Sequence, residues 1–251
     1  MCTPWNDPRR FRLIDSVTDY AILSHTWLRS QSGKITFDLW RKRDFDLLHL
    51  GYRKLVQFSR AALEDHGLSL GWMDTVCIDK SSSSELDESI RSMYKWYEDS
   101  SICITHLAES SSIADMANDS WFTRGWTLQE LIAPKILKFY DCNWNQLTSS
   151  FQVNDKSHEG VQDQIKLATS ITKGELALHY MPNHPISRRM QWAAKRRVTR
   201  GEDTAYSLMG IFDVSMSIAY GEGTGLAFSR LLKEIINTTK DGVLDIFNWA
   251  G

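Results

Sequence analysis

A tryptophan and a glutamate four residues apart, Trp126 and Glu130, stand in the segment SWFTRGWTLQELIAP, residues 120–134. On a helix, this spacing places the two side chains one turn apart on the same face. A carboxylate beside an indole can be a solvated side chain that shields an aromatic edge. It can also be an acid in an apolar cleft, where burial raises its pKa and sharpens its effect on a ligand. The spacing leaves both interpretations open.

Other residues with binding chemistry follow the apolar runs YAILSH and LGWMDTVCI. Ser24, His25 and Trp27 stand at the end of the first run, and Asp79 follows the second. His25 is either a hydrogen-bonded structural residue or part of a ligand pocket. Asp79 either caps its turn or contacts a ligand. Arg124, next to the glycine of TRGW, either meets an anion or forms a surface ion pair.

The elements that must position these residues alternate along the first 150 positions. Short apolar runs predict strands at residues 20–25, 70–78, 101–107 and 136–141. Helical spacing between the runs predicts helices at residues 51–67, 81–97 and 120–134. This alternation predicts an α/β fold with an open parallel sheet and helices on both faces. Such sheets bind ligands beyond the carboxyl ends of their strands, which is where the residues named above stand.

The chain changes character after about residue 150. The stretches EGVQDQIKLATSITK, SRRMQWAAKR, GEDTAYSLMGIF and TGLAFSRLLKEIINTT have helical patterns, and no convincing strand follows. We therefore expect an α/β part at residues 1–150 and a helical C-terminal extension of the same domain at residues 151–251. The basic residues of SRRMQWAAKRRVTR are expected to form a solvated helix face.

Composition excludes several classes of function. The net charge of −2 gives no field that favours nucleic acid as a partner. No apolar run approaches about 18 residues, so we expect no membrane span and a cytoplasmic protein. The cysteines are scattered without a C-x-x-C pair, which predicts reduced thiols and no metal site. They are Cys2, Cys77, Cys103 and Cys142.

Four long stretches carry a resemblance to a known family. They are YAILSHTW, WMDTVCIDKSSSSELDESIRSMYKWY, WFTRGWTLQELIAPK and the segment from RMQWAAKRRVTRGEDTAYSLMGIFDV to YGEG. In this order, over roughly residues 12–250, they resemble the fungal heterokaryon incompatibility (HET) domain. The resemblance implies an effector of programmed cell death in fungal allorecognition, an innate-immunity-like function. The sequence is most similar to HET domains that precede nucleotide-binding receptors. This similarity implies self-association or receptor-driven oligomerisation.

The HET family is in turn distantly similar to TIR domains, which implies a TIR/flavodoxin-like sheet. Many TIR domains act as NAD hydrolases through the glutamate of a W-x-x-x-E pattern, and WTLQE has this spacing. The resemblance implies Glu130 as the catalytic carboxylate and NAD as a possible substrate, with no cofactor. The residues expected to bind the substrate are Ser24, His25, Trp27, Asp79, Arg124 and Trp126. The alternative is a non-enzymatic TIR-like signalling module that oligomerises and recruits partners.

Overall fold

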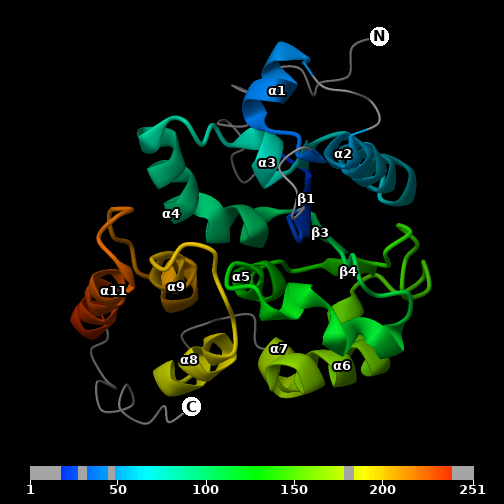
Figure 1. Ribbon diagram of the computed structural model, residues 1–251. Coiled ribbons are helices and arrows are strands. Elements are labelled where there is room, and N and C mark those ends of the chain that lie inside the picture. Colours follow the sequence, from blue (N-terminus) through cyan, green and yellow to red (C-terminus); the bar gives the residue numbers. More distant parts are fainter. Residues whose placement is uncertain (1–17, 28–32, 45–48, 178–183, 239–251) are drawn as a thin grey trace.

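A four-stranded parallel sheet lies at the centre of the computed structural model (Figure 1), which describes residues 18–27, 33–44, 49–177 and 184–238. The strand order is β2-β1-β3-β4, the order of the first four strands in flavodoxin-like sheets. The strands are β1 (Ala21–His25), β2 (Gly71–Trp72), β3 (Ile102–His106) and β4 (Leu137–Tyr140). The predicted α/β fold with an open parallel sheet is confirmed.

Both faces of the sheet are buried, because successive side chains of a strand point to opposite sides. Leu23 and Ile104 pack on one face against α2 (Leu50–Arg60), which continues as the π-helical turn η4 (Ala61–Asp65). Ile22 and Cys103 pack on the other face against α4 (Ser83–Asp99) and α5 (Thr127–Ile132). The short helices α1 (Phe37–Lys42) and α3 (Asp74–Cys77) complete this half.

Two predicted helix boundaries lie close to the observed ones, and local chemistry explains both. The side chain of Ser82 caps α4 by accepting a hydrogen bond from the backbone N–H of Glu85. Gly67 follows η4 with a φ of 67° and donates its N–H to the carbonyl of Leu63. This left-handed conformation at a helix end favours glycine.

Two predicted elements are wrong in type or extent. The run 70–78 contains only the two-residue strand β2, since the backbone N–H of Cys77 bonds to the carbonyl of Met73 and forms the turn of α3. The predicted helix 120–134 is divided into a 3-10 turn, η6 (Ser120–Thr123), and the shorter α5. Arg124 between them has extended backbone, with φ −82° and ψ 140°. Trp121 therefore packs in the core and does not share a helical face with Glu130.

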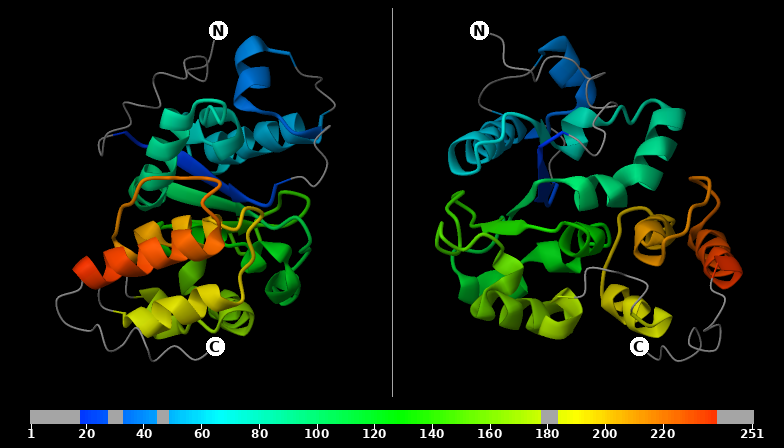
Figure 2. Two further views of the ribbon diagram at one scale, coloured as in Figure 1. Left: turned by 60° about the vertical axis from the view of Figure 1, so that its left-hand side comes forward. Right: turned by 180° about the vertical axis from the view of Figure 1, so that it is seen from behind.

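The second half is helical, as predicted, over its described residues. Its helices are α6 (Glu159–Thr169), α7 (Lys173–Ala177), α8 (Ile186–Ala194), α9 (Asp203–Tyr206), α10 (Met209–Phe212) and α11 (Thr224–Thr238). The 3-10 turns η5 (Ile113–Asn118) and η7 (Asp155–Ser157) precede them. α8 and α9 lie near α5, and α11 packs against the outer side of α9, on the side of the sheet away from α2 (Figures 1 and 2). Side chains of both halves, such as Phe139 and Val161, belong to one continuous core.

Buried charges tie the two halves together. The Nζ of Lys138, in β4, lies 3.0 Å from Oδ1 of Asp155, and both side chains are almost fully buried. Asp155 also accepts a hydrogen bond of 2.7 Å from the backbone N–H of Phe139. In the basic stretch, the expected solvated face is wrong for Arg189, which is buried and donates to the carbonyl of Ile211.

Two expectations drawn from the composition can be compared with the structure. Cys77, Cys103 and Cys142 are free thiols, as predicted, and Cys2 lies outside the described residues. No helix in the described part of the chain is both long and apolar enough to cross a membrane.

Candidate functional site

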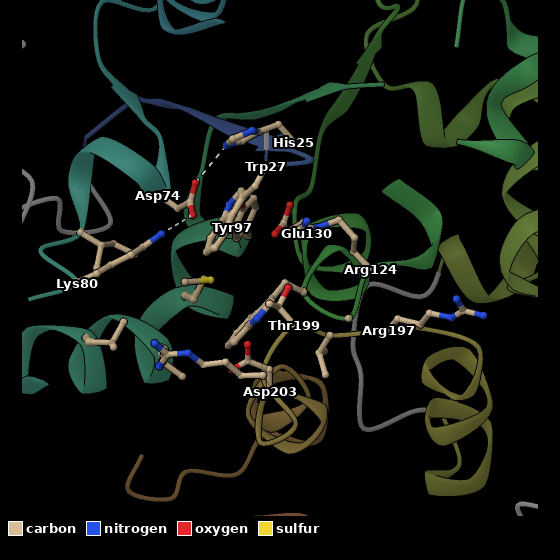
Figure 3. A pocket seen from close by; sticks show the side chains of 18 of the residues that line it. His25, Trp27, Asp74, Lys80, Tyr97, Arg124, Glu130, Arg197, Thr199 and Asp203 are labelled. Carbon is tan, nitrogen blue, oxygen red and sulfur yellow. Dashed lines mark hydrogen bonds and ion pairs between the residues drawn. The ribbon is translucent and has the colours of Figure 1, made fainter. Parts of the chain in front are cut away.

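A pocket of about 350 Å³ opens beyond the carboxyl end of β1 (Figure 3). Its walls come from β1, α3, α4, α5 and the segment 197–203 of the helical half. This is the position at which open parallel sheets bind ligands. Five of the residues predicted to act on or bind a ligand line it: His25, Trp27, Arg124, Trp126 and Glu130.

Glu130 lies in this pocket with 8% of its surface exposed, so the solvated interpretation of this residue is wrong. The hydroxyl of Ser24 donates a 2.5 Å hydrogen bond to Oε2 of Glu130. The indole N–H of Trp121 donates in turn to Ser24 Oγ over 2.8 Å. Because the indole can only donate, this relay directs the single proton of Ser24 toward the carboxylate. Ser24 itself is fully buried beneath Glu130 and does not line the pocket.

Burial raises the pKa of Glu130 to about 7. The hydrogen bond from Ser24 opposes this rise, and the negative charge of Asp74 adds to it. Arg124 and Arg196 act in the opposite sense as cations. The carboxyl group can therefore change its protonation state near neutral pH, which is uncommon for a surface glutamate and frequent for an acid in a functional site.

Arg196 brings a cation of the helical half close to α5. Its Nη1 donates to the carbonyl of Arg124 over 2.9 Å and to Oγ1 of Thr127 over 2.8 Å. Burial lowers the pKa of Arg196 to about 9, and the negative charge of Glu130 opposes the change. The first turn of α5 is thus held by a side chain that lies far away in the sequence.

Gly125 allows the segment 197–199 to form one wall. The backbone N–H of Gly125 donates to the carbonyl of Arg197 over 2.8 Å, and the N–H of Arg197 donates to the carbonyl of Thr123 over 2.6 Å. A Cβ atom on Gly125 would lie 2.4 Å from Cγ1 of Val198, which is closer than such atoms approach. A residue without a side chain is therefore needed for this contact.

A charged network lies across the pocket from Glu130. His25 Nε2 is 3.2 Å from Oδ1 of Asp74, and Lys80 Nζ is 3.3 Å from its Oδ2 (Figure 3). Although burial opposes it, Lys80 and His25 hold the pKa of Asp74 well below its usual range. Burial and the nearby ammonium of Lys54 lower the pKa of His25. At neutral pH the imidazole is therefore a neutral hydrogen-bonding group between a carboxylate and a buried lysine.

The outer part of the pocket is aromatic and basic. The ring of Trp27 has Lys80 Nζ 3.9 Å and Arg124 Cζ 5.5 Å from its centre. On the segment from the helical half, the guanidinium of Arg200 lies 4.2 Å from the ring centre of Tyr220. The hydroxyl of Tyr220 donates to Asp203 Oδ1 over 2.8 Å, which ties this rim to α9.

One predicted binding residue lies elsewhere, and several lining residues were not predicted. Asp79 does not line the pocket, and its Oδ1 accepts hydrogen bonds from the N–H and hydroxyl of Ser81. This is the turn-capping alternative for Asp79. Tyr97 lines the pocket at the end of the apolar stripe of α4, a position that helical spacing does reveal. Arg200 and Asp203 belong to the pocket through tertiary packing, for which local sequence gives no signal.

Comparison with known proteins places the chain in a family. The family model described as "Heterokaryon incompatibility protein (HET)" matches residues 20–116. The chain is also 37% identical over 230 residues to the vegetative incompatibility protein HET-E-1 of Podospora anserina. The chain belongs to the heterokaryon incompatibility (HET) family. The similarity to HET-E-1 covers 87% of this HET chain and 16% of that longer protein. No solved structure matches the HET chain significantly.

Proposed function

We propose that this chain is an effector of heterokaryon incompatibility that promotes cell death by cleaving NAD in the pocket at Glu130. Its membership of the HET family and its similarity to a protein named for vegetative incompatibility support the biological part. The chemical part rests on one observation: a buried carboxylate stands in a pocket at the carboxyl end of the parallel sheet. The effector would act in the cytoplasm after association with itself or with a receptor.

The reaction would consume one water molecule and one NAD molecule. The bond between C1′ of the ribose and the nicotinamide nitrogen breaks, and both bonding electrons leave with neutral nicotinamide. Positive charge develops on the ribose, water adds to C1′, and one proton is released with ADP-ribose. A fixed carboxylate beside C1′ stabilises this charge. The hydrogen bond from Ser24 gives Glu130 a fixed orientation for this purpose.

The raised pKa of Glu130 suits a substrate with a positively charged ring. With a pKa of about 7, about half of the free chains carry an ionised Glu130 at neutral pH. The nicotinamide ring of NAD is cationic, so its arrival favours the ionised carboxylate. We therefore expect kcat/KM to rise with pH through about 7, because kcat/KM reports the ionisation of the free enzyme.

The pocket offers a surface for a flat ring beside the acid. Ile90 and Met93 of α4 line it together with the rings of Tyr97 and Trp126. Apolar and aromatic walls with few polar groups are typical of small-molecule sites. A nicotinamide ring placed there would present its ribose to Glu130.

Nicotinamide release from NAD by purified protein tests this proposal. The wild-type chain, Glu130→Gln and the control Glu159→Gln would be compared as clustered samples, because the effector is proposed to act after association. Glutamine retains an oxygen that accepts the hydrogen bond from Ser24, and Glu159 is an exposed residue of α6. We expect Glu130→Gln to lower the rate at least about 100-fold and Glu159→Gln to leave it unchanged.

The opposite result has a defined meaning. If clustered wild-type protein releases no nicotinamide, and Glu130→Gln kills fungal cells as strongly as the wild type, the enzymatic part is refuted. The chain would then act as a non-enzymatic module that recruits partners.

A further inference from the structure

Three cations gather around one exposed indole at the mouth of the pocket. The Nζ atoms of Lys80 and Lys34 lie 3.9 Å and 6.0 Å from the ring centre of Trp27, and Cζ of Arg124 lies 5.5 Å away. Trp27 is 40% exposed and Lys80 is exposed, while Lys34 and Arg124 are half-buried, so the cluster lies at the boundary between the pocket and solvent. Like charges held this close repel one another unless an anion joins them.

Arg124 forms no ion pair with the carboxylates that the structure describes. Within the described part of the chain, no carboxylate lies within 4.0 Å of its guanidinium, and its Nε has no hydrogen-bond acceptor. Lys80, in contrast, is paired with Asp74 at 3.3 Å. Arg124 thus keeps a planar fork of donors, the geometry that matches phosphate oxygens.

Charge is ordered along the depth of the pocket. The carboxylate of Glu130 is buried, Arg124 is half-buried, and Lys80 and Arg200 are exposed residues of the same lining. Figure 3 shows Arg124 beside Glu130 and Lys80 on the far side of Asp74. The volume of about 350 Å³ lies at the low end of the roughly 300–1,000 Å³ found for ligand sites. This volume includes the space beside the basic lining residues, so it suits one ring, its ribose and the adjoining phosphates, and the rest of a larger ligand must extend past Trp27.

We infer that the mouth is a diphosphate-binding subsite, in which Arg124 and Lys80 contact phosphate oxygens beside Trp27. This inference rests on the proposed function and specifies its substrate class: a dinucleotide or nucleoside diphosphate ribose binds, and a nucleoside without phosphate binds poorly. The phosphates would neutralise the three cations, and the ribosyl end would reach Glu130. Affinity would fall with ionic strength, since exposed charges are screened by salt.

Binding of ADP-ribose to the purified chain tests the inference without any turnover. Titration calorimetry would compare ADP-ribose with nicotinamide riboside, which carries no phosphate, on the wild type, Arg124→Gln and Arg124→Lys. Arg60→Gln is the matched control, because Arg60 of α2 is an exposed arginine paired with Glu64 of η4, and neither residue lines the pocket. We expect Arg124→Gln to weaken ADP-ribose binding about 10- to 100-fold, the range for losing a charged hydrogen bond. Arg124→Lys would recover part of the loss.

The nicotinamide riboside measurement separates a phosphate contact from a general effect of Arg124 on Glu130. A diphosphate subsite predicts that Arg124→Gln weakens the binding of ADP-ribose at least about 10-fold more than the binding of nicotinamide riboside. Equal losses for both ligands, a loss no larger than that of Arg60→Gln, or no saturable ADP-ribose binding would each overturn the inference. Arg124-dependent ADP-ribose binding by a chain that releases no nicotinamide would uphold it and refute the proposed hydrolysis.

Discussion

Replacement of Glu130 by glutamine removes a buried charge and keeps a side chain of the same size. The pKa of Glu130 is raised from its usual 4.5 to about 7, chiefly by burial. A carboxyl group with a raised folded-state pKa contributes its full stability below the unfolded pKa and loses it as pH rises through the folded pKa. At about 1.4 kcal/mol for each pH unit between the two values, ionisation of Glu130 costs the folded state about 3 kcal/mol above pH 7.

Glu130→Gln should therefore become more stable relative to the wild type as pH rises. Between pH 5 and pH 8, the difference in the free energy of unfolding should grow by about 2–3 kcal/mol in favour of the variant. Urea denaturation of both proteins at the two pH values measures it. The attraction of Arg196 is already contained in the pKa, so it needs no separate correction.

A pH-independent difference between the two proteins would refute the claim that this carboxylate is desolvated. The same pair of denaturation series on Glu159→Gln gives the size of the effect at an exposed position. A variant that gains stability while it loses nicotinamide release would show that the acid is retained for function at a cost to folding.

Other perturbations probe the support around the acid. Gly125→Ala should destabilise the chain by about 1–3 kcal/mol, because the new methyl group meets Val198, and Val198→Ala in the same chain should restore part of the melting temperature. Ser24→Ala removes the hydrogen bond that favours ionised Glu130. The pH profile of kcat/KM should then move about 1 to 2 pH units toward alkaline values, and an unmoved profile would contradict the relay. Asp155→Asn leaves its buried lysine partner uncompensated and should cost about 3–5 kcal/mol in urea denaturation.

Much of the sheet could be predicted from local patterns. The runs at β1, β3 and β4 are continuous and apolar, as strands buried on both faces must be. The strand prediction was wrong beyond Trp72, because Thr75, Val76 and Ile78 are β-branched residues in an apolar stretch. Such a stretch has the same pattern in a buried strand and in a single buried helical turn. The bonds that decide between them involve Met73 and Cys77, and periodicity does not reveal them.

The sequence raised the question of whether Glu130 is buried, but local patterns could not answer it. Its helix, α5, is too short to define a face by itself. Whether the carboxylate meets water depends on α4 and on the segment around Val198, which is placed by contacts far away in the sequence. Asp79 is the opposite case. Its position after an apolar run predicted a binding role, but its carboxylate accepts a hydrogen bond from the hydroxyl of Ser81 in the same turn.

The main-chain hydrogen bonds between the segment at Gly125 and Arg197 determine where the chain can be truncated for experiments. Because these hydrogen bonds involve only main-chain atoms, substitution of the Arg197 side chain leaves them intact. A chain truncated before residue 197 lacks them completely. A fragment designed on the family-model boundaries would stop at residue 116 and would lack both the acid and the opposite wall. Inactivity of such a fragment would report the missing half of the cavity, and expression plasmids should extend through α11, whose Leu231 lies in the shared core.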